Sequence, residues 1–134
     1  MLKEMNDALA LEMRAIAMYS HYAAYVKGIH RIALSAHFST EANESMQHAD
    51  LVRAAIVKYG GIAVTERNSK PILHTEDYKE MLQQSLETEE EAAKIYRGLL
   101  DLVAEAGDDE LVDTIESIYF TELRSVEEVR LLMS

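Results

Sequence analysis

The chain has 134 residues, the size of one ordinary domain, and 49% of them are hydrophobic, enough to form a packed core. Its formal net charge of −11 leaves no basic stripe for nucleic acid, and no run of about 18 apolar residues is present that could cross a membrane. No cysteine is present, which excludes disulfides, thiolate metal sites and thiol catalysis and is consistent with a cytoplasmic protein. We therefore expect a single domain over residues 1–134.

Apolar residues recur at alternating steps of four and three along most of the chain, a pattern typical of helices that pack in a bundle. The pattern predicts four helices, near residues 2–27, 31–59, 75–105 and 109–133. The chain has one proline and five glycines, which allows long helices and disfavours a sheet protein. The predicted fold class is therefore all-α.

The segments between the helices predict how they connect. Gly28 and Gly107 each end one helix a few residues before the next begins, so the helices of each pair should be antiparallel. Residues 60–74 have no helical period. Stretched at about 3.3 Å per residue, this segment can cover a helix of about 28 residues that rises about 1.5 Å per residue. We predict a four-helix bundle of two antiparallel hairpins joined by a long crossover, with the second and third helices parallel.

Each predicted helix has acidic or histidine residues near the middle of its apolar stripe. These residues are Glu12 in the first helix, Glu41 and His48 in the second, Glu89 in the third and Glu122 in the fourth. A glutamate is rarely buried without a partner, and the stripes contain no lysine or arginine. A bound metal cation is the simplest shared counter-charge.

The two hairpins carry these positions in the same register. Each hairpin has three positions at intervals of 33 and 36 residues from the first: Glu12, Ser45 and His48 in one, and Glu89, Glu122 and Ser125 in the other. The shared register is what a repeated pair of helices would give. In a repeat of this kind, one helix contributes a Glu, and its partner contributes Glu-x-x-His on one face. The first hairpin keeps the His and has Ser45 for the Glu, whereas the second keeps the Glu and has Ser125 for the His.

These residues resemble the diiron site of the ferritin-like superfamily, above all that of bacterioferritins and of short bacterioferritin-like or rubrerythrin-like bacterial proteins. The most specific stretches are residues 8–12, 44–50 with Gly60 and Gly61 behind them, 89–94, and Glu122. The resemblance covers nearly the whole chain and implies a ferritin-like bundle. In the family two irons are held by six side chains, so iron (Fe2+/Fe3+) is the implied metal, with Mn2+ or Zn2+ as alternatives for the same donors.

Carried over position by position, the resemblance implies four metal ligands: Glu12, His48, Glu89 and Glu122. Ser45 stands where a bridging Glu is expected, and Ser125 stands where the second His is expected. Glu44 lies four residues before His48 and so shares a helix face with it. A small rotation of the second helix would let Glu44 replace the missing bridge, and Glu41 is a weaker substitute.

Other residues match the family less specifically. Met46 stands where a methionine ligates haem between two bacterioferritin subunits, but methionine is also a common gap-filler at interfaces, so haem is not the expected cofactor. Tyr19 matches a tyrosine near the diiron centre, although a tyrosine on a stripe usually serves packing. The remaining histidines are expected at the surface or at hairpin ends: His21, His30, His37 and His74.

Two functions from different classes follow. The first is an iron-binding protein, with ferroxidase activity as the resemblance implies. The alternative is a non-catalytic helical protein that keeps a vestigial site and acts through oligomerisation or partner binding, which the serines at positions 45 and 125 favour. The absence of cysteine opposes a rubrerythrin-type peroxidase, and the acidic charge opposes direct binding of DNA.

The resemblance also implies an assembly. We expect a homodimer formed by the flanks of the first two helices, with a larger shell as an alternative. The large residues expected on this flank are Met18, Tyr22, Tyr25, Met46 and Leu51. The sequence ends at Ser134, after the fourth stripe, so the fifth helix that lines the channels of bacterioferritin shells is not expected.

Overall fold

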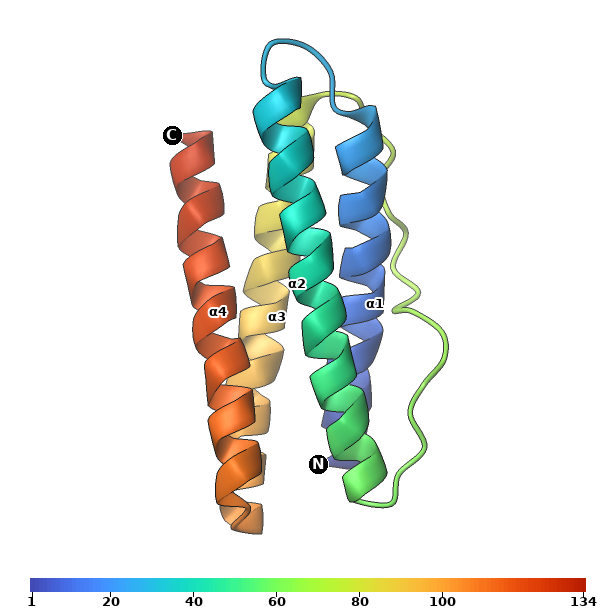
Figure 1. Ribbon diagram of the computed structural model, residues 1–134, viewed down its shortest axis with the longest axis vertical. Helices are drawn as coiled ribbons and strands as arrows, with labels where there is room; N and C mark the ends of the chain where they lie inside the picture. The colour runs from blue at the N-terminus through green and yellow to red at the C-terminus, as the bar shows by residue number, and fades with distance from the viewer.

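The computed structural model describes residues 1–134 as four helices with no strand (Figure 1). The helices are α1 (Leu2–Tyr25), α2 (Arg31–Lys58), α3 (Tyr78–Ala106) and α4 (Asp109–Met133). Figure 1 shows that α2 and α3 run in the same direction, and that the crossover between them runs back along α1. The predicted all-α bundle of two hairpins and one crossover is confirmed.

The two hairpin turns depend on glycines with left-handed backbone. Gly28 has φ of +86° and Gly107 has φ of +75°, a region that glycine enters at little cost. After the second turn, the side chain of Asp108 accepts a hydrogen bond from the backbone N–H of Leu111 at 3.0 Å and caps α4. Asp108 also accepts from Lys58 Nζ at 2.6 Å and from the Tyr59 hydroxyl at 2.8 Å, which ties the end of α2 to the start of α4.

The helix boundaries agree with the prediction to within two residues except for the start of the third helix. Helix α3 begins at Tyr78, three residues later than expected, because local side-chain hydrogen bonds replace the first helical turn. Thr75 Oγ1 accepts from the backbone N–H of Asp77 at 3.1 Å, and the Asp77 carboxylate accepts from the N–H of Lys79 at 2.9 Å and caps the helix.

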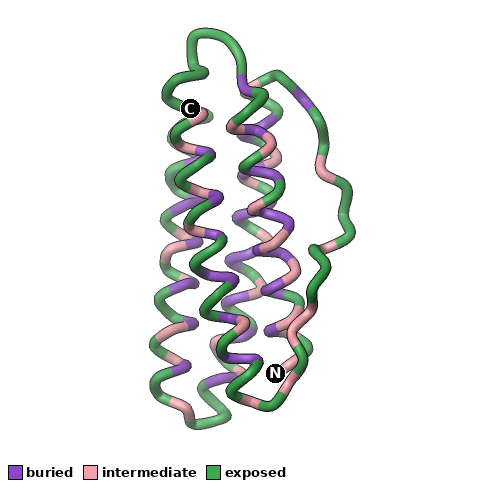
Figure 2. Tube along the Cα trace, turned by 45° about the vertical axis from the view of Figure 1, so that its right-hand side comes forward, coloured by how far each residue is buried: buried purple, intermediate pink, exposed green.

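The crossover is fastened to α1 by a buried arginine. Arg14 is 1% exposed and donates from Nε to the Lys70 carbonyl and from Nη2 to the Pro71 carbonyl, both at 3.0 Å. The Asn68 N–H adds a bond to the Ala10 carbonyl at 2.9 Å. The crossover itself is mostly exposed or half-buried (Figure 2), so these hydrogen bonds, rather than burial, hold it along the bundle.

The interior contains two apolar clusters. One has 13 buried residues, contributed by all four helices, and the other has 10, contributed by α1, α2, α3 and Val26 just after α1. Along α1 the first cluster ends at Leu9 and the second begins at Ala15, so Glu12 falls between them. The same order holds on α2, where Ala42 belongs to one cluster and Ala49 to the other. The polar positions of the stripes therefore form a layer between two apolar layers.

Two residues expected on an exposed flank lie inside the molecule, so that part of the assembly prediction was wrong. Met18 and Tyr22 are both 0% exposed. Met18 Sδ accepts from the Thr88 hydroxyl of α3, and the Tyr22 hydroxyl donates to a crossover carbonyl at 2.8 Å. Met46 of the same predicted flank is exposed, as are Tyr25 and Leu51. None of the four helices is long and apolar enough to cross a membrane.

Candidate metal centre

Each helix brings one of the predicted ligands to the centre of the bundle. Glu12 comes from α1, His48 from α2, Glu89 from α3 and Glu122 from α4, and all four are buried. They occupy the inward stripe of their helices because each lies three or four residues from apolar neighbours on that stripe. No lysine or arginine pairs with any of them.

Three of these side chains converge closely. His48 Nδ1 lies 3.1 Å from Glu12 Oε2 and 3.0 Å from Glu122 Oε1. One ligand atom from each of the three residues lies within 4.8 Å of the other two, which is compact enough to surround a single cation. Two carboxylates and one imidazole are donors that Fe2+, Mn2+ and Zn2+ accept.

Two buried tyrosines orient the carboxylates. The Tyr96 hydroxyl donates to Glu12 Oε2 at 2.9 Å, and the Tyr19 hydroxyl donates to Glu89 Oε1. Hydrogen bonds of this kind fix the position of a ligating carboxylate. The resemblance pointed to Tyr19, whereas the sequence analysis missed Tyr96 as a partner of the site. Its position on the same stripe as Glu89, two turns further on, was the available signal.

The electrostatics of this layer favour protons or a cation. Burial raises the pKa of Glu122 to about 8, and the charges of Glu12 and Glu44 add to that effect. Burial also raises the pKa of Glu12 and raises that of Glu89 well above its usual range. For His48, burial lowers the pKa, but the hydrogen bond and charge of Glu12 outweigh it, so the net shift is upward. A bound cation would replace these protons.

The donors present therefore fit a metal ion. Glu122 Oε1 faces His48, but when Glu89 and Glu122 are both ionised, the second oxygen of Glu122, Oε2, is buried with no hydrogen-bond partner. A buried carboxylate oxygen without a partner costs free energy that a cation would recover. Because this oxygen lacks a partner and no lysine or arginine is nearby, a metal ion is a better counter-charge here than a basic side chain.

The two serine positions create a different environment on the side of α2 and α4. Ser45 and Ser125 are buried, at 5% and 7% exposure. The Ser125 hydroxyl lies 3.3 Å from Glu44 Oε1 and 3.4 Å from Glu41 Oε2. Glu44 is thus brought next to the Ser125 position, outside the compact group of Glu12, His48 and Glu122.

A polar hollow opens to the surface at this point. It is lined by Glu41, Glu44, Thr121, Arg124, Ser125 and Glu128, and none of its lining residues is hydrophobic. Burial raises the pKa of Glu41 to about 8, and the charges of Glu89 and Glu44 add to the shift. The hollow therefore leads from solvent to the edge of the buried carboxylate layer.

The remaining predicted residues lie away from the compact group. Met46 is 51% exposed on α2. His21 Nε2 and His74 Nδ1 form a hydrogen bond of 2.8 Å that joins α1 to the crossover. His30 is exposed at the start of α2, and the half-buried His37 packs against Phe38.

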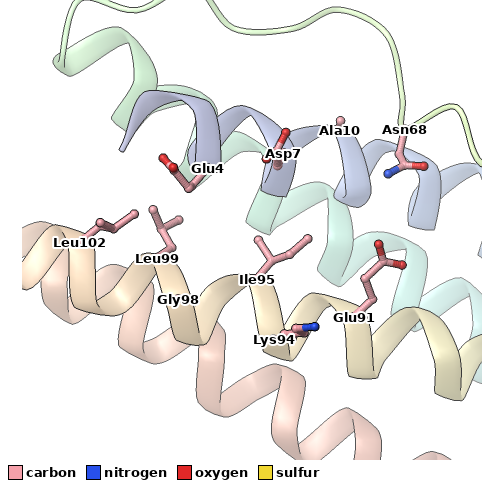
Figure 3. A pocket seen from close by; sticks show the side chains of 10 residues that line it. All are labelled: Glu4, Asp7, Ala10, Asn68, Glu91, Lys94, Ile95, Gly98, Leu99 and Leu102. Atoms are coloured by element: carbon pink, nitrogen blue, oxygen red, sulfur yellow. The ribbon is translucent and has the colours of Figure 1, made fainter.

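A larger surface pocket than this hollow, about 650 Å³, lies elsewhere, between α1, α3 and the crossover. Figure 3 shows Glu4 and Asp7 of α1 facing Ile95 and Leu99 of α3, with Asn68 of the crossover at one end. Two of its three acidic side chains already have partners, since Glu4 pairs with the N-terminal ammonium at 2.7 Å and Asp7 pairs with a lysine at 2.8 Å. This pocket contains none of the converging ligands of the centre.

A four-helix bundle with a buried carboxylate–histidine layer is typical of ferritin-like proteins, and comparisons with known families and solved structures agree with that class. The sequence model of the family described as ferritin-like domain matches residues 2–133, so the chain belongs to the ferritin-like family. A solved structure from Bacillus anthracis str. Ames, described as a ferritin-like, diiron-carboxylate protein, is 32% identical to this chain. The match covers 99% of this chain and 94% of that chain, with a TM-score of 0.94. No curated protein matches the chain.

Proposed function

We propose that this protein binds iron at the centre of its bundle, with Glu12, His48 and Glu122 as the ligands of one ion. The observation that carries the proposal is the convergence of these three side chains within 4.8 Å, in a layer with no other counter-charge. Mn2+ or Zn2+ would satisfy the same donors. The similarity to a protein described as a diiron-carboxylate protein supports iron.

Glu122 would also serve a second ion, together with two further carboxylates. Glu89 supplies a carboxylate to that position from α3, where the Tyr19 hydroxyl holds it. Glu44 adds a carboxylate from α2, next to Ser125. The proposed metal ligands are therefore Glu12, Glu44, His48, Glu89 and Glu122.

The proposed chemistry is oxidation of Fe2+ by O2. Two Fe2+ ions each lose one electron, and one O2 takes up both electrons and two protons to form H2O2. Carboxylate donors stabilise the Fe3+ that results more than the Fe2+ that enters. A centre with only one filled position supplies one electron at a time, so the oxidation rate should depend on occupancy of the second position.

Anaerobic titration with Fe2+, followed by metal analysis of the washed protein, tests the proposal. The variant His48→Ala should bind Fe2+ more weakly by over about 100-fold, because loss of a direct ligand should exceed the 10–100-fold typical of its supporting partners. His30→Ala is the matched control, since this histidine is exposed and outside the layer. Equal affinities, or a wild-type protein that binds no Fe2+, would favour the non-catalytic alternative.

We also propose that the minimum assembly is a homodimer. Tyr25, Met46 and Leu51 remain exposed on α1 and α2, and large apolar side chains exposed on these two helices are candidates for a self-complementary interface. Light scattering should give about twice the chain mass of 15.1 kDa, and Leu51→Glu should shift the equilibrium to monomer. A monomer mass for the unmodified protein across micromolar concentrations contradicts the dimer, and a much larger mass would indicate a shell.

A further inference from the structure

We propose that His21 and His74 form a second metal site, separate from the carboxylate layer, for a divalent cation that prefers nitrogen ligands, Cu2+ above all. His21 lies in the last turns of α1, and His74 lies in the crossover that runs along this helix (Figure 1). A bound ion would join two segments that are 53 residues apart in the sequence. The site does not depend on the proposed binding of iron.

The geometry of the two ring nitrogens carries the proposal. His21 Nε2 and His74 Nδ1 face each other at 2.8 Å, a distance at which one proton joins them in a hydrogen bond. Two nitrogen ligands at right angles on one ion, each at about 2.0 Å, are also about 2.8 Å apart. An ion can therefore replace the shared proton if the rings turn, without the two nitrogens moving apart. Right-angled ligands suit the square-planar ions Cu2+ and Ni2+.

The other nitrogen of each ring is free to carry the proton. Neither His21 Nδ1 nor His74 Nε2 forms a hydrogen bond with the protein, since the contact between the two rings is the one that each histidine makes. Each ring can thus hold its proton on that nitrogen and present a lone pair to the metal, as metal binding requires. His74 is exposed and His21 is half-buried, so an ion can enter from solvent.

Neighbouring contacts hold the pair in place before a metal arrives. The Tyr22 hydroxyl donates to the Leu73 carbonyl at 2.8 Å, and each of these residues is adjacent in sequence to one of the histidines. The ring centroid of Tyr25 lies 4.5 Å from that of His21 and 4.8 Å from that of His74. Because the backbone and the rings are already ordered, binding pays less entropy to bring the ligands together.

The charges around the pair also favour a cation of this class. No lysine or arginine contacts either ring, and Lys27, just after α1, is paired with Glu76 of the crossover. The net charge of −11 attracts cations to the surface. No carboxylate forms an ion pair with either ring, so the site has nitrogen ligands, for which Cu2+ stands highest in the affinity order of the divalent metals. The buried layer, in contrast, supplies mainly carboxylates.

Electron paramagnetic resonance of the protein with one equivalent of Cu2+ tests this inference, because the spectrum counts the coordinated nitrogens. The buried group of Glu12, His48 and Glu122 offers one imidazole, whereas the surface pair offers two. The unmodified protein should show splitting from two nitrogens. His21→Gln and His74→Gln should each lose this pattern and weaken Cu2+ binding by at least about tenfold.

A matched control and a second readout separate a metal site from a hydrogen bond. His30→Gln removes an exposed histidine outside the pair and should keep the two-nitrogen pattern. Cu2+ should also slow hydrogen exchange in residues 68–74 of the crossover, and should not do so in His74→Gln. The inference is overturned if the unmodified protein shows a single nitrogen, if His30→Gln loses the pattern equally, or if His74→Gln binds Cu2+ with unchanged affinity. None of these results bears on iron binding in the buried layer.

Discussion

The two sides of the carboxylate layer share one topology and register but differ in how they are enclosed. Glu12, His48 and Glu122 form a closed side, in which each residue is at most 6% exposed. Glu41 and Glu44 form an open side, half-buried at a polar hollow next to Ser125. Ser45 and Ser125, which stand where the resemblance implies longer ligands, are buried in this layer, and Ser125 lines the hollow.

The apolar packing reinforces this difference. On the closed side, α4 contributes Leu111, Ile115 and Ile118 to the larger apolar cluster. The smaller cluster, next to the open side, contains no residue of α4. Since fewer apolar contacts hold α4 there, that side should admit water and cations more readily.

The largest expected loss of metal affinity comes from substituting Glu122, the residue that both proposed metal positions share. Glu122→Gln should weaken binding at both positions, by over about 100-fold at the first, because the amide removes the negative charge and one metal-binding oxygen. Glu12→Gln should weaken the first position alone. Anaerobic Fe2+ titration of the two variants measures the difference, and identical losses would show that the two positions are not distinct.

Substituting the two buried tyrosines, Tyr96 and Tyr19, should separate the two proposed metal positions by a smaller effect on affinity. Tyr96→Phe removes the donor to Glu12, and Tyr19→Phe removes the donor to Glu89. Each change should reduce affinity by about tenfold or more, at the first position for Tyr96 and at the second for Tyr19. Each should also cost about 1–3 kcal/mol of stability in the metal-free protein, because a buried carboxyl loses its partner.

Titration and urea unfolding together check the tyrosine prediction. Should both variants weaken the same ion, the assignment of Glu12 and Glu89 to separate positions is wrong.

The stability of the metal-free protein should depend on pH in a defined direction. The pKa values of Glu41 and Glu122 are raised to about 8 by burial, above the unfolded value of 4.5, and that of His48 is raised as well. Groups with raised folded pKa values contribute stability below their unfolded values and lose it as pH rises through the folded ones. The urea midpoint should therefore fall between about pH 5 and about pH 8.5.

Two comparisons sharpen this pH prediction. The double variant Glu41→Gln/Glu122→Gln should show a flatter pH dependence, because two of the titrating groups are gone. Saturating metal should reverse the trend, since ligands must lose their protons to bind it. A midpoint that rises with pH in the metal-free protein would mean that the carboxylates of this layer are ionised at neutral pH.

The smallest effect is expected far from the centre. Asp108→Asn weakens the cap of α4 and the ion pair with Lys58, so Tm should fall slightly. The pKa of Asp108 is lowered to about 2, first by Lys58, so its contribution is present above pH 3.8 and is lost as pH falls toward 2. Metal stoichiometry should be unchanged, and a loss of bound iron would show that the hairpin turn controls the layer.

Much of this protein could be predicted from the chain alone because the relevant signals are local. The steps of four and three define the inward face of each helix, and so they place Glu12, His48, Glu89 and Glu122 inside the bundle. The length of the segment after α2 predicts the parallel arrangement of α2 and α3. The intervals of 33 and 36 residues bring the polar positions of both hairpins to the same height.

The tertiary structure alone decided which groups meet across the bundle, because those contacts depend on neighbours distant in sequence. No local pattern distinguishes Arg14 from a surface arginine, yet crossover carbonyls 56 and 57 residues away bury it. The sequence pattern places Met18 and Tyr22 on the flank of the first helix, but in the folded protein Thr88 and the crossover cover them. A one-dimensional stripe specifies which way a side chain faces, whereas its partner depends on how the helices pack and where the crossover lies.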